Sequence, residues 1–291
     1  MDQSMTYDLP LQAGKISGAS LNEIRRWRWT HGGAMPDKSA LLDYQFGDFR
    51  FDFLWQPKPD SNRLFLIFSG DAMRKKNDPP VFQRWSWAPY FPGNCLFVSD
   101  PALYISEKIG LAWYSGVRRC DFLKVISVLV DEVIETLRID VQNVYSYGSS
   151  GGGFAALRLA CFSTNVKPIA INPQTQICQY EYRSVERYLQ KCLNVQSRHD
   201  GELLFSERLN LCNHSSLLSE RRIFYIQNVL DTHHVDVHYK PFCESMGVST
   251  EHDLEHPSFK RYHFSHPDGH RKAETREVFI ELMTQIEKGK F

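Results

Sequence analysis

The stretch VQNVYSYGSSGGGFAALRLA, residues 141–160, decides the fold of this chain. Its apolar run at 144–147 predicts a strand, and the apolar pattern at 152–161 predicts a helix. Between the two, Ser150 stands at the centre of a Gly-x-Ser-x-Gly pattern, with a glycine two residues away on each side. A nucleophile raised on a tight turn between strand and helix leaves no room for side chains at those two positions. The pattern therefore predicts a nucleophilic serine, Ser150.

Other glycine-rich turns are the alternatives to this interpretation. Ser149 is a poorer candidate because Tyr147 stands two residues before it. A phosphate-binding P-loop is disfavoured because no Gly-Lys-Ser/Thr follows, and the dinucleotide fingerprint G-x-G-x-x-G is absent. A glycine turn without a nucleophile remains open.

Strand and helix patterns alternate on both sides of this turn. Residues 42–56 alternate apolar and polar side chains around a Gly-Asp turn, which predicts an antiparallel hairpin. Continuous apolar runs predict buried parallel strands at 64–68, 95–98, 168–171 and 223–226, and a last strand is expected at 260–264. Helices are expected at 121–139, 181–193, 235–246 and 271–288. The sequence thus predicts an α/β fold, a three-layer sandwich with a mostly parallel central sheet and an N-terminal antiparallel hairpin.

The Ser150 turn and the strand order resemble those of the α/β-hydrolase superfamily, of the serine esterase or acyltransferase type. The resemblance runs from the hairpin near residue 42 to the last helix, and it implies the chain order nucleophile, acid, histidine. Asp231 follows the strand at 222–228 and is the expected acid, with helix capping as its alternative role and Asp236 as the substitute. His270 lies in the loop before the last helix and is the expected general base, with His266 as the alternative.

The resemblance also implies a pocket around Ser150. Gly151 is expected to supply one amide of an oxyanion hole, and Asp71 or Ala72, in the turn after the strand at 64–68, the other. Gly70 in the same turn allows close approach of the backbone, and Gly70, Asn172 and Gln174 are expected to contact substrate. The aromatic residues at 82–91 are expected to lie in the core rather than to wall the pocket.

Histidines are frequent near the C-terminus, which raises the question of a metal site. His234 and His238 are four residues apart and could share one helical face as zinc ligands. No H-E-x-x-H is present. The sequence predicts no metal and no cofactor.

Length and composition bound the domain organisation and the partners. The chain has 291 residues, of which 42% are hydrophobic, and its 34 basic residues balance 34 acidic ones. We expect residues 1–40 to form an N-terminal extension and residues 41–291 to form a hydrolase domain, with a cap insertion within residues 174–220. Neutral charge disfavours nucleic acid, and the basic aromatic residues 25–29 (RRWRW) are expected to form a helix face.

The compartment is predicted from what the sequence lacks. The first twenty residues have no basic start followed by an apolar run, and no stretch approaches the ~20 apolar residues of a membrane span. The seven cysteines are scattered without a C-x-x-C pair, which indicates reduced thiols. We expect a cytoplasmic protein without stable membrane insertion.

Three functions fit this sequence. The first is a serine hydrolase that cleaves a small-molecule or glycan ester through an acyl-enzyme on Ser150. The second is an acyltransferase or deacylase that acts on a glycan. The third is a hydrolase-fold protein without catalytic activity that binds a ligand or partner.

Overall fold

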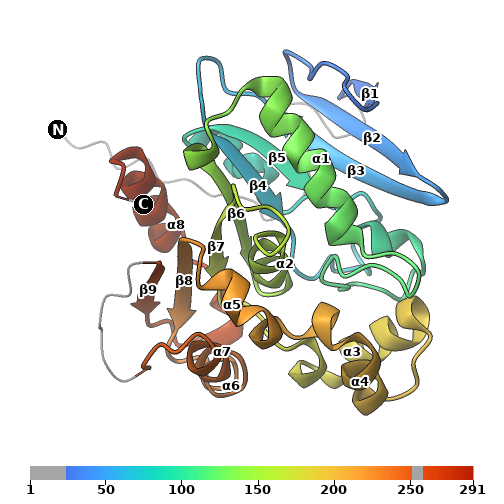
Figure 1. The fold of residues 1–291 in the computed structure, drawn as a ribbon, viewed down its shortest axis with the longest axis vertical. Coiled ribbons are helices and arrows are strands. Elements are labelled where there is room, and N and C mark those ends of the chain that lie inside the picture. The colour runs from blue at the N-terminus through green and yellow to red at the C-terminus, as the bar shows by residue number, and fades with distance from the viewer. Residues whose placement is uncertain (1–23, 251–257, 291) are drawn as a thin grey trace.

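The computed structural model describes residues 24–250 and 258–290. The first twenty residues, on which the expectation about export rests, lie outside this range. Within it, nine strands form one sheet in the order β1-β2-β3-β5-β4-β6-β7-β8-β9 (Figure 1). Their bounds are β1 Arg26–Arg28, β2 Ala40–Phe46, β3 Phe49–Gln56, β4 Leu64–Phe68, β5 Asn94–Val98, β6 Val144–Ser149, β7 Lys167–Ile171, β8 Ile223–Asn228 and β9 Phe259–Phe264.

The strand directions confirm the predicted fold class. Strands β2 and β3 form the expected antiparallel hairpin, and β3 pairs antiparallel with β5. From β5 through β4, β6, β7 and β8 to β9 every pairing is parallel. The carboxyl ends of β4, β6, β7, β8 and β9 therefore meet at one edge of the sheet, where the loops that follow them gather.

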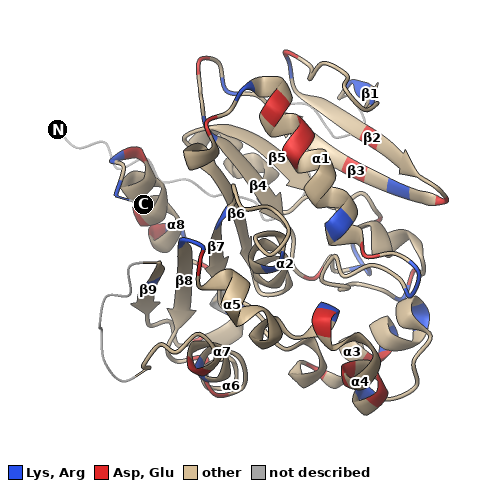
Figure 2. Cartoon of the chain, viewed as in Figure 1, with Lys and Arg blue, Asp and Glu red and all other residues tan. Residues whose placement is uncertain are grey.

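The central strands are buried on both faces, which explains their continuous apolar sequences. In β4, Leu64, Leu66 and Phe68 belong to one core cluster, and Phe65 and Ile67 belong to another. Strands β4, β5, β6 and β8 carry no charged residue and are tan in Figure 2, whereas β2 and β3 carry red or blue segments. Such strands need helices on both sides, because a strand alternates its side chains between two faces.

Helices cover the two faces and complete the three layers. One face packs against α1 (Phe122–Leu137) and α2 (Gly151–Leu159), and the other against α8 (Arg276–Glu287) and a 3-10 helix, η2 (Trp85–Tyr90). In α1 the apolar side chains recur every three or four residues, and each buried one contributes about 1.5–3 kcal/mol relative to exposure. The aromatic residues at 82–91 lie largely in the second core, as expected.

The chain between β7 and β8 is a helical excursion. It contains the 3-10 helix η5 (Ile177–Gln179), α3 (Tyr182–Tyr188), the π-helical turn η6 (Leu189–Leu193), α4 (Arg198–Leu209), the 3-10 helix η7 (Leu211–His214) and α5 (Ser215–Leu218). After β8 come α6 (Thr232–His234), the π-helical turn η8 (Val235–Tyr239) and α7 (Lys240–Ser245). The 3-10 helix η9 (Gly269–Lys272) lies between β9 and α8. The excursion occupies the segment in which the sequence predicts a cap.

The basic aromatic segment at 25–29 was wrongly expected to form a helix. Residues 26–28 form β1, which pairs in parallel with β2 at the edge of the sheet. Arg26 and Arg28 are exposed, whereas Trp29 is only 5% exposed and lies in the core. Alternating arginine and tryptophan has the two-residue period of a strand, and this period decides the structure here. Part of the segment assigned to an extension thus belongs to the sheet.

Two further expectations concern the cysteines and the membrane. All seven cysteines are unpaired. Among the residues that the structure describes, no helix combines the length and the apolar character needed to cross a bilayer.

Candidate active site

Ser150 occupies a strained turn between β6 and α2. Its φ of 57° and ψ of −123° are a conformation that residues other than glycine rarely adopt, and its amide donates to the carbonyl of Ile171 at 2.9 Å. A Cβ on Gly148 would lie 2.9 Å from Gly152 Cα, and a Cβ on Gly152 would overlap the carbonyl oxygen of Phe68. Both glycines of the pattern are therefore required by close backbone packing.

The structure brings Ser150, His270 and Asp231 together. Ser150 Oγ lies 2.9 Å from His270 Nε2, and His270 Nδ1 lies 3.0 Å from Asp231 Oδ2. Asp231 is 6% exposed, and the His270 side chain is 30% exposed. A buried carboxylate fixes which imidazole nitrogen carries the proton, so the other nitrogen can accept the hydroxyl proton of Ser150.

Asp231 is surrounded by donors. Besides His270, it accepts from Asn172 Nδ2 at 3.2 Å, from His234 Nδ1 at 3.1 Å and from the His234 amide at 3.4 Å. Burial by itself would raise the pKa of Asp231, but the hydrogen bonds and charges of His234 and His270 lower it well below its usual value. Asp231 also caps α6, so the same carboxylate begins a helix and contacts His270.

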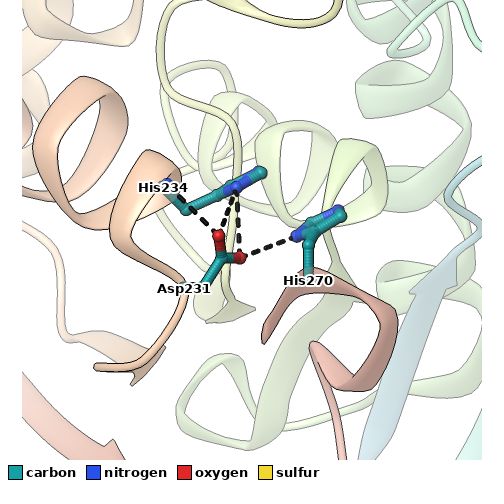
Figure 3. Close-up of side chains that lie close together, drawn as sticks. All are labelled: Asp231, His234 and His270. Atoms are coloured by element: carbon teal, nitrogen blue, oxygen red, sulfur yellow. Dashed lines mark hydrogen bonds and ion pairs between the residues drawn. The ribbon is translucent and has the colours of Figure 1, made fainter. Parts of the chain in front are cut away.

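A second histidine, His234, shares this carboxylate. Figure 3 shows the rings of His234 and His270 side by side, and their centroids are 3.9 Å apart with planes at 7°. Burial lowers the pKa of His234, which is 2% exposed, and Asp231 offsets this only in part. Because Nδ1 faces Asp231, the neutral ring carries its proton there, and Nε2 is left as an acceptor.

Gln174 connects His234 to Ser150. Its Nε2 lies 3.1 Å from His234 Nε2 and donates to Ser150 Oγ at 2.8 Å, while its Oε1 accepts from Trp113 Nε1 at 3.1 Å. Gln174 is 0% exposed. Since Ser150 Oγ accepts from Gln174, its own hydrogen is directed toward His270. Two chains of hydrogen bonds thus run from Asp231 to the serine.

The residues expected to contact substrate lie in different positions. Gln174 contacts the serine itself. Asn172 is fully buried, and its side-chain Nδ2 donates to Asp231 while its Oδ1 accepts from the Asn228 backbone amide at 2.6 Å. It therefore contacts Asp231 instead of facing an entrance. Gly70 does approach the site, because a Cβ placed on it would lie 3.8 Å from Ser150 Cβ.

The backbone amides near the expected oxyanion hole differ in whether they already donate a hydrogen bond within the protein. The Ala72 amide donates to the carbonyl of Gly110 at 2.8 Å, and the Gly70 amide donates to Gln83 Oε1 at 2.9 Å, so both are occupied. Among the hydrogen bonds of the described residues, neither the Asp71 amide nor the Gly151 amide at the start of α2 has a partner. Asp71 and Gly151 therefore remain as candidate donors, and Ala72 does not.

The alternative acid and base lie elsewhere. Asp236 pairs with Lys240 at 2.6 Å on an exposed surface. The His266 Nδ1 accepts from the Asp268 amide at 3.2 Å. Among the described hydrogen bonds, neither Asp236 nor His266 contacts Ser150 or His270, whereas His270 contacts both Ser150 and Asp231.

Three possible metal ligands meet in this site. Donor atoms of Asp231, His234 and His270 lie within 4.8 Å of one another. A cation at both Nδ1 atoms would replace the protons that face Asp231, so metal binding and the hydrogen-bonded arrangement exclude each other. His238, which the spacing raised as a possible ligand beside His234, is not part of this group among the described residues, and its Nδ1 accepts from the Thr175 amide at 3.4 Å.

A buried ionic cluster behind Ser150 was not predicted from the sequence. Arg84 Nε donates to Glu274 Oε2 and Arg84 Nη2 to Ser149 Oγ, each at 2.5 Å, and the Tyr147 hydroxyl donates to Glu274. Burial raises the pKa of Glu274, and Arg84 offsets part of this effect. Glu274 follows His270 by four residues, so the cluster ties the histidine loop to β6. No local pattern indicates it, because its members lie up to 190 positions apart.

Comparison with known proteins identifies the fold. The sequence matches no protein-family model and no curated protein sequence. The capsule O-acetyltransferase of Neisseria meningitidis serogroup A gives a TM-score of 0.56 at 16% identity, over 89% of this chain and 95% of its own. The S-formylglutathione hydrolase of Agrobacterium tumefaciens gives 0.54 at 14% identity, over 85% and 92%.

A larger protein shares the same architecture over part of its length. The acylaminoacyl peptidase of Pyrococcus horikoshii gives a TM-score of 0.59 at 11% identity, over 86% of this chain and 41% of its own. At such identities the likeness is one of fold. Together with the mostly parallel sheet and the strained turn at Ser150, these neighbours establish that the chain has the α/β-hydrolase fold.

Proposed function

We propose that the protein is a serine hydrolase that forms an acyl-enzyme on Ser150 and cleaves a carboxylic ester. The observation that carries this proposal is the continuous hydrogen-bonded chain from Ser150 Oγ through His270 to Asp231, with the serine raised on a strained turn. Such a constellation is recognised by geometry and roles rather than by overall sequence.

The first half of the reaction follows from these positions. Ser150 Oγ attacks the ester carbonyl carbon as its proton passes to His270 Nε2, and Asp231 stabilises the imidazolium that forms. The carbonyl oxygen becomes an oxyanion, which the Gly151 and Asp71 amides stabilise by donation. The oxyanion then collapses, the carbon–oxygen bond to the alcohol breaks, and His270 returns the proton to the departing alcohol.

The second half regenerates the serine. Water attacks the acyl-enzyme while His270 removes its proton, and collapse of the second tetrahedral intermediate releases the acid and Ser150. His234 and Gln174 stay neutral throughout. His234 holds Asp231 in position by hydrogen bonding, and Gln174 does the same for Ser150.

A second candidate keeps the acyl-enzyme and transfers the acyl group to a hydroxyl of a glycan. Its support is the likeness to the capsule O-acetyltransferase, of which one structure is a complex with CoA. Incubation with an acyl ester and sugar acceptors separates the two: free acid alone indicates hydrolysis, and an acylated sugar indicates transfer.

The test of both candidates is covalent labelling with a fluorophosphonate probe. Ser150→Ala should abolish labelling of the folded protein. Ser149→Ala is the neighbouring control and should remain labelled, because the Ser149 hydroxyl is buried and accepts from Arg84. Undiminished labelling of Ser150→Ala would exclude the proposed nucleophile.

A further inference from the structure

A basic cavity lies beside the candidate active site. It has a volume of about 350 Å³ and is bounded by the turn after β4, the loop at 108–111 and α3. Five of its lining residues are cationic: Arg74, Lys75, Lys76, Lys108 and Arg187. The only acidic lining residue is Asp71. In a chain whose charges balance overall, this is a local excess of positive charge.

The cations of this cavity are poorly neutralised by the protein. Within the described ranges, Lys75, Lys76, Lys108 and Arg187 take part in no ion pair. Arg74 contacts Asp78 at 3.4 Å, but that carboxylate is almost fully exposed. The Arg74 side chain is 11% exposed, and its Nε is buried without a hydrogen-bond partner. Like charges gathered this way repel one another, so an anion that enters the cavity relieves the repulsion.

Two residues of the cavity wall, Asp71 and Leu111, connect the cavity to the surroundings of Ser150. Asp71, at its edge, has the amide that is free to face an oxyanion. Leu111, another lining residue, packs over Gly151, because a Cβ on Gly151 would collide with its methyl group. A ligand in the cavity would therefore lie beside Asp71, and the Leu111 side chain would separate it from Gly151.

The third wall links the cavity to the histidine. Ser184 and Arg187 of α3 line the cavity, and Tyr180, just before α3, packs on His270 with ring centroids 6.2 Å apart. The volume is that of a small-molecule site. Lysines bind phosphate as point charges, and arginine binds phosphate or carboxylate with paired hydrogen bonds.

We propose that this basic cavity binds an anionic group, phosphate or carboxylate, on the ester whose acyl group Ser150 removes. The proposal rests on the proposed function, because it names the substrate class of the same site. Anion binding in the cavity would make the enzyme selective for esters that carry a negative charge beside the reacting carbonyl. The ester chemistry at Ser150 is unchanged from that described above.

The binding experiment uses the Ser150→Ala protein, so that it does not depend on catalysis. Pyrophosphate is titrated by calorimetry into this protein and into the same protein with K75Q and K108Q added. The pair K38Q and K288Q, two exposed lysines outside the cavity, is the control with the same charge change. Loss of the cavity lysines should weaken pyrophosphate binding by about tenfold, and the control should not. Equal affinity in all three proteins would overturn the proposal.

The turnover experiment separates the two proposals and the two anions. Wild type, K75Q/K108Q and K38Q/K288Q are assayed with phenyl acetate, 4-acetoxybenzoate and 4-acetoxyphenyl phosphate. We expect kcat/KM to favour one or both charged esters, and the preference to disappear through KM in K75Q/K108Q alone; the preferred ester identifies carboxylate or phosphate. Hydrolysis of all three esters without charge preference would overturn the basic site and leave the serine hydrolase. Pyrophosphate binding that depends on Lys75 and Lys108, without any Ser150 labelling, would support the site and overturn the hydrolase.

Discussion

Replacement of Gln174 by leucine tests the second chain of hydrogen bonds directly. The substitution places an apolar side chain of similar size in a position that is fully buried. It removes the hydrogen bonds that Gln174 makes with Ser150, His234 and Trp113. Trp113 Nε1 and His234 Nε2 are then left without partners in residues that are themselves buried.

The size of the effect follows from these two orphaned groups. A buried polar group that loses its partner costs about 1–3 kcal/mol, so the free energy of unfolding should fall by roughly 2–6 kcal/mol. This is a large part of the ~5–15 kcal/mol by which a typical domain is stable. Labelling of Ser150 should slow but persist, since His270 still accepts its proton.

A double-mutant cycle with Trp113→Phe isolates one of the bonds. Each single variant leaves one member of the Trp113–Gln174 hydrogen bond without its buried partner, whereas the double variant removes both members, so its cost should be smaller than the sum by about 1–3 kcal/mol. Urea denaturation followed by far-UV circular dichroism measures all four proteins. Additivity within about 0.5 kcal/mol would refute the Trp113–Gln174 hydrogen bond and, with it, the fixed orientation of the amide.

Two further variants test the turn and the acid response. Gly152→Ala should lower the free energy of unfolding by about 2 kcal/mol or more, because its Cβ overlaps the Phe68 carbonyl. Gly70→Ala is the control and should change the free energy of unfolding by less than ~0.5 kcal/mol, because its Cβ meets nothing closer than 3.5 Å. Urea denaturation measures both, and a larger loss for Gly70→Ala than for Gly152→Ala would contradict the prediction. Burial and the neighbouring histidines lower the pKa of His238 to about 2. In the unfolded chain His238 takes up a proton below pH 6.5, whereas in the folded protein it stays neutral. The free energy of unfolding therefore falls by about 1.4 kcal/mol for each pH unit below pH 6.5. His238→Phe should remove roughly 2 kcal/mol of the loss between pH 6.5 and 5 in the same assay, and an unchanged pH slope would refute it.

The secondary structure was predicted best where a local pattern decides it. The strands at 64–68 and 223–226 were found because both faces are buried and the apolar runs are continuous. The helices at 181–193 and 235–246 are predicted only in outline, because a π-helical turn follows the regular helix in the first and precedes it in the second. β1 was missed because three residues of alternating sequence become a strand only when β2 pairs with them.

The site residues divide in a similar way. Ser150 could be predicted because the sterics of its turn require glycines at fixed neighbouring positions. Asp231 and His270 followed from their places after strands, given a resemblance that fixes the chain order. The roles of Gln174, His234 and the Arg84–Glu274 cluster could not be predicted, because hydrogen bonds between distant segments leave no periodic signal.

The sequence by itself thus determined the α/β architecture and the turn that raises Ser150, since both depend on interactions between residues close along the chain. Only the tertiary structure decided which amides stay free, since the Ala72 amide is taken by Gly110 across a loop. It also decided that Asp231 serves two stacked histidines and that five scattered cations line one cavity. Hydrogen bonding, burial and local charge depend on which segments meet in space, and that meeting is fixed only when the sheet assembles.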